Sequence, residues 1–194
     1  MSPDDTSPRR SRARAAMAHP SHDSVTSAPR RGACVPNDEV RQRFLALSVI
    51  LTGFDDAELW GTGMVDEYLG WLLGTVGDRF TGDLLSATEY AIDEAKGDQA
   101  KLEILVRENI LADASLGPIA RNLIVLWYLG QWNQLPADWR DAHGASALDQ
   151  TCIVSPDAYV QGLAWKAIYT HPTGAKMPGY ASWALTPHGA EDIP

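Results

Sequence analysis

Residues 118–130 read Pro-Ile-Ala-Arg-Asn-Leu-Ile-Val-Leu-Trp-Tyr-Leu-Gly, and this stretch decides the class of fold. Pro118 suits the start of a helix, where its missing N–H costs nothing. From Ile119 to Leu129 the predicted helix is apolar on nearly every side. A helix of this kind is buried in the middle of a bundle or covered by a partner. The stretch therefore predicts a central helix and leaves both coverings open.

Apolar residues recur at helical spacing before and after this stretch. They predict further helices over 38–52, 55–77, 80–92, 102–111 and 155–168. Asp38 and Ser155 are the expected N-caps of the first and last of these, and Pro156 suits the first helical position. No regular strand alternation recurs, so we expect an all-α fold, an irregular bundle of about six helices. Within the helical pattern we interpret four glycines as points where backbones approach closely: Gly61, Gly63, Gly70 and Gly74.

Composition divides the 194 residues into three parts. Residues 1–37 are rich in proline and serine and poor in large apolar side chains, which predicts a disordered leader. Residues 38–170 form the predicted helical domain, with a polar connection over 131–150. Residues 171–194 combine proline and glycine with Met177, Tyr180 and Trp183, which predicts an extended arm that packs on its own bundle or lies on another protein.

Charge excludes some classes of function. The net charge is −9, and the first 40 residues hold six arginines against five acids, so residues 41–194 carry −10. An acidic surface argues against nucleic acid as a partner. A spanning helix needs about 20 apolar residues, and the longest uninterrupted run is Leu123 to Gly130, so no transmembrane segment is expected.

Residues with catalytic chemistry are few. His171 could act as a general base, although a histidine at the end of the predicted last helix more often interacts with the helix dipole. Ser155 lacks the glycines of a nucleophile elbow, and its capping role explains it. No catalytic, cofactor-binding or metal site is therefore predicted. Cys152 is a candidate for an intersubunit disulfide, and a reduced, partly buried thiol is the alternative.

Four stretches carry a resemblance to a known family. They are Phe44-Leu45-x-Leu47-Ser48-x-x-Leu51-Thr52-Gly53, Leu126-Trp127-Tyr128-Leu129-Gly130-x-Trp132, Val154-Ser155-Pro156-x-Ala158-Tyr159-x-x-Gly162-Leu163-x-Trp165-x-Ala167-Ile168 and His171-Pro172-x-Gly174-Ala175-Lys176-x-Pro178-Gly179-Tyr180-x-Ser182-Trp183-Ala184. Together they resemble the small (gamma) subunit of membrane-bound, FAD-dependent sorbitol and related sugar dehydrogenases. The last two in tandem are the most specific.

The resemblance implies an accessory role in an oxidoreductase complex. In such complexes a large flavoprotein subunit holds FAD, a multihaem cytochrome c subunit holds haem c, and the small subunit assists maturation, stability and export of the flavoprotein. It implies that this chain binds neither cofactor. It also predicts contacts with the flavoprotein through ten residues: Trp127, Tyr128, Trp132, Tyr159, Trp165, His171, Pro172, Pro178, Tyr180 and Trp183.

Small subunits of this kind typically carry a twin-arginine export signal, and here the sequence departs from the pattern. Arg9-Arg10 is not followed by the apolar segment that such a signal needs. The resemblance places the complex on the periplasmic side of the inner membrane, and a cytoplasmic location is the alternative. A folding chaperone that leaves the complex and a free-standing helical enzyme using His171 are the alternative functions.

Overall fold

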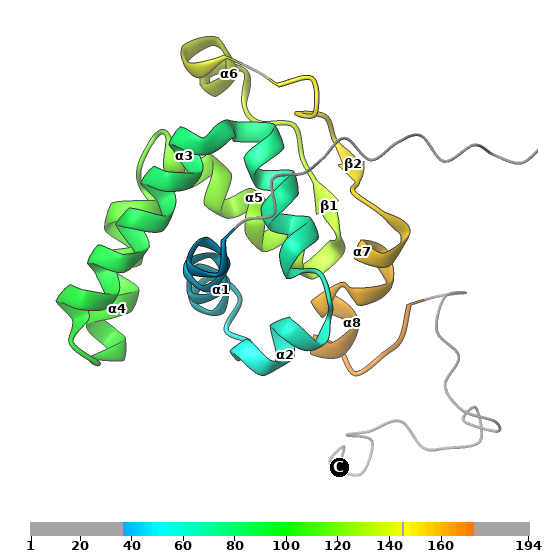
Figure 1. The fold of residues 1–194 in the computed structure, drawn as a ribbon, viewed down its shortest axis with the longest axis horizontal. Helices are drawn as coiled ribbons and strands as arrows, with labels where there is room; N and C mark the ends of the chain where they lie inside the picture. The colour runs from blue at the N-terminus through cyan, green and yellow to red at the C-terminus, as the bar shows by residue number, and fades with distance from the viewer. Residues whose placement is uncertain (1–36, 145, 173–194) are drawn as a thin grey trace, which may run out of the picture. The chain divides into compact units, whose positions relative to one another are not determined.

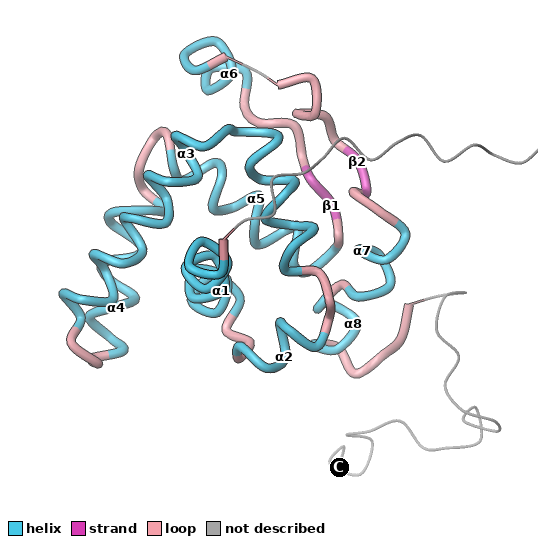
Figure 2. Tube along the Cα trace, viewed as in Figure 1, coloured by secondary structure: helices cyan, strands magenta, loops and turns pink. Residues whose placement is uncertain are grey.

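The computed structural model describes residues 37–144 and 146–172. Helices account for most of this part of the chain, and the two strands are very short (Figures 1 and 2). The elements are α1 (Asp38–Thr52), α2 (Asp56–Gly61), α3 (Val65–Ala95), α4 (Gln99–Val106), the π-helix η1 (Arg107–Leu111), α5 (Leu116–Leu129), β1 (Gln131–Trp132), α6 (Ala137–His143), β2 (Cys152–Ile153), α7 (Pro156–Gln161) and α8 (Leu163–Ala167).

The all-α class is confirmed, and α5 lies at the centre of the helical packing. It contacts α1, α3, η1, α7 and α8. Trp127 is 1% exposed and packs edge-on against Tyr68 of α3, with ring centroids 4.8 Å apart. Its indole Nε1 donates a hydrogen bond to Ser48 Oγ of α1 at 3.0 Å. The sequence left open whether the bundle or a partner covers this helix. In the structure the chain's own helices bury Trp127.

The two helices expected over 55–77 and 80–92 are divided differently in the structure. A short α2 ends at Gly61, and Gly63 turns the chain with a φ of +72°. The helix α3 then runs from Val65 to Ala95 with a kink at Gly77, whose φ of +82° is not helical. Glycine tolerates this conformation because it has no Cβ. The predicted break between two helices at Gly77 is therefore confirmed, because this residue interrupts the helical conformation of α3.

The connection over 131–150 is less polar than its sequence suggested. Trp132, Leu135 and Trp139 are buried, and α6 lies within it. The carboxylate of Asp149, itself 3% exposed, accepts hydrogen bonds from Trp132 Nε1 and from the Leu135 N–H, both at 3.0 Å. β1 and β2 pair in antiparallel register, with Trp132 opposite Cys152. The buried carboxylate of Asp149 therefore stabilises the conformation of a segment that the sequence predicts to be a polar connection.

Helix capping follows the sequence closely. Ser155 caps α7 as expected, accepting a hydrogen bond from the Ala158 N–H, and Pro156 is the first helical residue. For α1 the cap is Asn37 rather than Asp38, which stands one residue inside the helix. The predicted last helix is two helices, since Gly162 breaks the run between α7 and α8.

Close backbone approach occurs at different glycines from those expected. A Cβ added at Gly61, Gly63 or Gly70 would meet no atom within 4 Å, and one at Gly74 would meet only the Leu148 side chain. In contrast, a Cβ on Gly130 would lie 2.4 Å from the Ala158 carbonyl group, and one on Gly162 would lie 2.7 Å from Tyr128 O. Because these two glycines have no Cβ, the end of α5 can lie close to α7 and α8.

Within the described residues no single helix is long and apolar enough to cross a membrane. The segments Gln99–Leu111 and Leu116–Leu129 meet the length and composition criteria together, but they are bent by 113° relative to each other. The predicted leader, apart from Asn37, and the predicted arm, apart from His171 and Pro172, lie outside the described residues.

Candidate functional site

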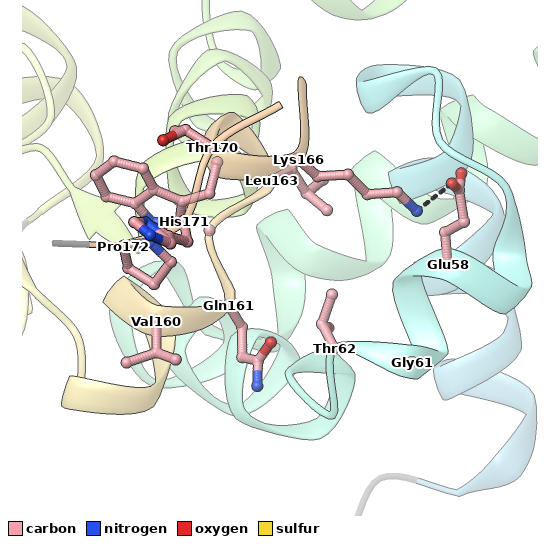
Figure 3. Close-up of a pocket in the computed structure, with 12 residues that line it drawn as sticks. Glu58, Gly61, Thr62, Val160, Gln161, Leu163, Lys166, Thr170, His171 and Pro172 are labelled. Atoms are coloured by element: carbon pink, nitrogen blue, oxygen red, sulfur yellow. Dashed lines mark hydrogen bonds and ion pairs between the residues drawn. The ribbon is translucent and has the colours of Figure 1, made fainter. Parts of the chain in front are cut away.

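A pocket of about 460 Å³ lies between α2 and the segment formed by α7, α8 and the residues that follow (Figure 3). Its walls combine apolar surface with polar side chains that can form hydrogen bonds. The polar side chains are Glu58, Thr62, Gln161, Lys166, Thr170 and His171.

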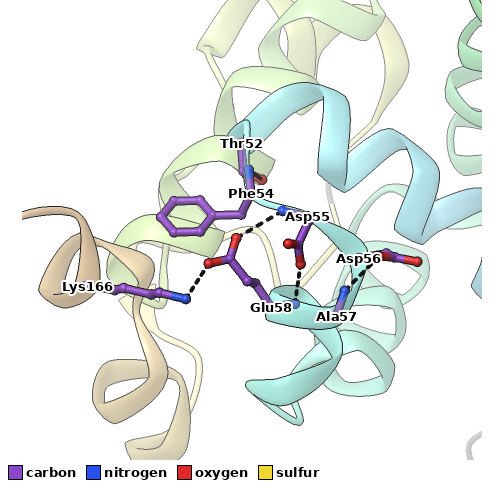
Figure 4. Close-up of polar contacts among 7 residues, drawn as sticks. All are labelled: Thr52, Phe54, Asp55, Asp56, Ala57, Glu58 and Lys166. Carbon is purple, nitrogen blue, oxygen red and sulfur yellow. Dashed lines mark hydrogen bonds and ion pairs between the residues drawn. The ribbon is translucent and has the colours of Figure 1, made fainter.

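Glu58 is held in place by a capping box at the start of α2 (Figure 4). Asp55 Oδ1 accepts a hydrogen bond from the Glu58 N–H at 2.7 Å, and Glu58 Oε2 accepts one from the Asp55 N–H at 3.1 Å. The other oxygen, Oε1, pairs with the Lys166 ammonium of α8. Lys166 Nζ also lies 5.7 Å from the centre of the Phe54 ring, within the range of a cation–π contact. The pair therefore ties α2 to α8 across the pocket.

The hydrogen bond from Lys166, followed by that from the Asp55 N–H, lowers the pKa of Glu58 below its ordinary value of 4.5. A carboxyl whose pKa is lower in the folded state stabilises the fold above the unfolded pKa, and this contribution is lost as the pH falls through the folded pKa.

We therefore expect the wild type to lose more stability than Glu58→Gln on acidification from pH 6 to pH values below 4.5. Glutamine retains the side-chain acceptor of the capping box and removes only the titrating charge. Urea unfolding of both proteins across this range checks the prediction. Parallel pH dependence of the two would show that Glu58 contributes nothing to the acid sensitivity.

Trp165 and Tyr159 form the aromatic wall next to the pocket. Their rings pack edge to face with centroids 5.4 Å apart, and Trp165 Nε1 donates a hydrogen bond to Tyr159 O at 2.8 Å. Both side chains are half-buried. Because the Trp165 N–H is already engaged, the indole offers ring surface rather than a hydrogen bond to anything that enters the pocket.

His171 and Pro172 stand at the end of the described chain and line the same pocket. His171 is exposed, whereas Pro172 is buried. α8 ends at Ala167, so His171 does not sit at the end of the last helix as the sequence suggested. The expected interaction with that helix dipole is therefore wrong, because such effects act within the last turn.

Two of the ten residues expected to contact a partner are placed in the core instead. Trp127 is 1% exposed and Trp132 is 0% exposed. Tyr128 is half-buried, and its hydroxyl donates a hydrogen bond to Thr52 O at 2.8 Å. The central helix thus turns its tryptophan inward, and the expectation that Trp127 and Trp132 form a partner-facing surface is corrected.

The other expected contact residues divide into two groups. Tyr159, Trp165, His171 and Pro172 come together at the pocket or beside it, whereas Pro178, Tyr180 and Trp183 lie outside the described residues. Cys152 is a free, half-buried thiol on β2. The intersubunit disulfide stays a prediction.

Sequence reasoning missed Glu58 and Lys166 as pocket residues. The Asp55-x-x-Glu58 spacing is the pattern of a capping box and could have revealed the local half of this arrangement. The pairing with Lys166 had no local signal, since the two residues are 108 positions apart.

No group of three or more potential metal ligands occurs among the described residues. Comparisons with protein-family models, curated proteins and solved structures find no match to this chain.

Proposed function

We propose that this chain is a non-catalytic small subunit of an FAD-dependent sugar or polyol dehydrogenase complex. It assists the maturation, stability and export of the flavoprotein, which holds FAD, and a cytochrome c subunit with haem c accepts the electrons. The complex acts on the periplasmic side of the inner membrane, with a cytoplasmic location as the alternative.

The proposal rests on the contacts that join the first three of the four family-like stretches. Ser48 of the first stretch is bonded to Trp127 of the second, and Gly130 of the second packs against Ala158 of the third. Three stretches therefore form one packed unit. The fourth begins at His171, and all but its first two residues lie outside the part of the chain that the structure describes. We assign the contact with the partner to this fourth stretch.

Exposed apolar side chains lie close to this point. Ile168 is 65% exposed and Tyr169 is 84% exposed, and both directly precede the arm. Trp60, next to the pocket residue Gly61 on α2, is 42% exposed. Aromatic side chains are enriched at protein interfaces because they bury a large area with little loss of conformational freedom. These residues support a docking role for the pocket region together with the arm.

Removal of residues 173–194 is expected to abolish co-purification with the flavoprotein subunit of the proposed complex. The described domain should keep its helical circular dichroism, because all of its helices lie before residue 173. Co-expression of both chains followed by affinity purification provides the measurement.

A chain ending after Pro187 is the matched control, since it keeps the fourth stretch and loses only the last residues. It should co-purify like the wild type. Survival of the complex without residues 173–194 would show that the arm does not form the interface.

Two alternatives lead to different measurements. A folding chaperone would be needed for FAD loading but absent from the mature complex, so subunit stoichiometry separates it from a permanent subunit.

A free-standing enzyme is suggested by the position of His171 in a pocket with Glu58 and Lys166. The purified chain would then turn over a substrate by itself, and His171→Ala would remove that activity while the fold is retained.

A further inference from the structure

Away from this pocket, two adjoining apolar pockets of about 440 and 320 Å³ form a groove between α1 and α4. Ile50 of α1 and Leu102 of α4 line both of them. We call this surface the α1–α4 groove. Ile92 of α3 and Ile124 of α5 also contribute to its lining.

The α1 wall has the pattern of a helix-packing surface. Ala46, Val49 and Ile50 follow the spacing i, i+3, i+4, which places them on one face of the helix. Gly53, which ends the helix in a left-handed conformation, lines the groove next to them. Ala46, Val49 and Ile50 are only half-buried, and a Cβ added at Gly53 would meet no atom within 4 Å. Such an apolar stripe is normally covered by another helix, and small residues at its ends let a neighbouring helix come close.

The opposite wall contains an irregularity in the helix. α4 passes directly into the π-helix η1, and Arg107 and Leu111 of η1 line the groove. π-Helical turns are rare and occur frequently at functional sites. Ile92 remains 38% exposed, which is high for a residue that lines an apolar pocket.

The rim of the groove is acidic. Its lining includes the carboxylates of Asp55, Asp56 and Glu103 and one guanidinium, that of Arg107, so three negative charges against one positive charge leave −2. Among the described residues none of these three carboxylates forms an ion pair with the chain's own cations; Asp55 and Asp56 accept hydrogen bonds from backbone N–H groups. Charge near an apolar groove selects partners of opposite sign.

We propose that the α1–α4 groove binds an amphipathic helix of another protein that presents apolar anchors at i, i+3, i+4 and i+7 and is flanked by Lys or Arg. A second copy of this chain would bring acids against acids. In the leader the arginines at positions 9–14 are accompanied mainly by alanines, which are too small to fill the pockets, and residues 171–194 hold a single lysine, Lys176, and no arginine. This proposal does not depend on the identity of the dehydrogenase partner.

The test uses the full chain and a fluorescein-labelled helical peptide of about 18 residues with leucines at those positions and lysines elsewhere. We expect saturable binding by fluorescence anisotropy and weakening as salt is raised. Ile92→Gln should weaken binding at least about tenfold. Ile104→Gln, at an exposed isoleucine on α4 outside the groove, should bind like the wild type. A peptide with glutamates in place of the lysines should bind at least about tenfold more weakly.

Equal binding of the lysine and glutamate peptides, or equal effects of the two isoleucine substitutions, would overturn the proposal. A dimer that Ile92→Gln abolishes would assign the groove to a second copy. Peptide binding that emerges only after deletion of residues 1–36 would assign it to the leader. Either of these results also overturns it, as does an absence of peptide binding.

Discussion

Gly130→Ala is expected to destabilise the protein by about 3 kcal/mol, because the substitution combines two costs. Gly130 ends α5 in the left-handed region at φ +66°, which costs about 1 kcal/mol for a residue with a Cβ. The added Cβ would also lie 2.4 Å from the Ala158 carbonyl group, and overpacking of this kind costs about 2 kcal/mol. Because the contact is with backbone, α7 has to move. Equilibrium urea unfolding followed by circular dichroism measures the loss.

Gly53→Ala is the matched control for this prediction. Gly53 ends α1 in the same conformation, at φ +76°, but a Cβ there would meet no atom within 4 Å. Only the backbone cost should remain, about 1 kcal/mol. The difference between the two variants isolates the close approach of α5 and α7. Equal losses would mean that α7 is not held against Gly130 in solution.

Trp127→Ala is expected to cost about 3–5 kcal/mol, the range for removing a large buried aromatic side chain. The indole packs between Phe44, with centroids 6.3 Å apart, and Tyr68, and its loss would also leave Ser48 Oγ without its donor. Urea unfolding of the isolated chain, without any partner, makes the measurement.

Trp60→Ala provides the comparison, since this tryptophan on α2 is 42% exposed. Its loss should cost about 1 kcal/mol in the isolated chain, because much of the side chain already contacts water. Similar small losses for both tryptophans would show that Trp127 is not packed until a partner covers it. That result would support the prediction from the sequence that Trp127 contacts a partner.

Burial also affects the ionisation of Tyr68, whose ring packs against Trp127 in the core. Burial, with a smaller contribution from the charge of Glu67, raises the pKa of its phenol. Its hydroxyl has no hydrogen-bond partner among the described residues. The core around Trp127 is therefore one in which the helices cover polar atoms as well as apolar ones, and a pattern of apolar residues alone cannot indicate this.

Much of the fold was predictable because the interactions that specify it are local. The N-cap at Ser155, the helix start at Pro156, the break near Gly77 and the apolar run of α5 all arise within a few residues along the chain. The resemblance to a dehydrogenase small subunit also rests on sequence alone, as do the predicted leader and arm. For the candidate site, the sequence brought together Tyr159, Trp165, His171 and Pro172, which are near one another along the chain.

The tertiary structure decided which of two surfaces covers each apolar face, because that depends on residues far apart in sequence. The hydrogen bond from Trp127 to Ser48 joins residues 79 positions apart, and the ion pair of Glu58 with Lys166 joins residues 108 positions apart. A periodic pattern shows that a face is apolar, and it does not show whether the chain itself or another protein buries it. For α5 the chain's own helices bury that face, whereas the stripe on α1 is left half-covered.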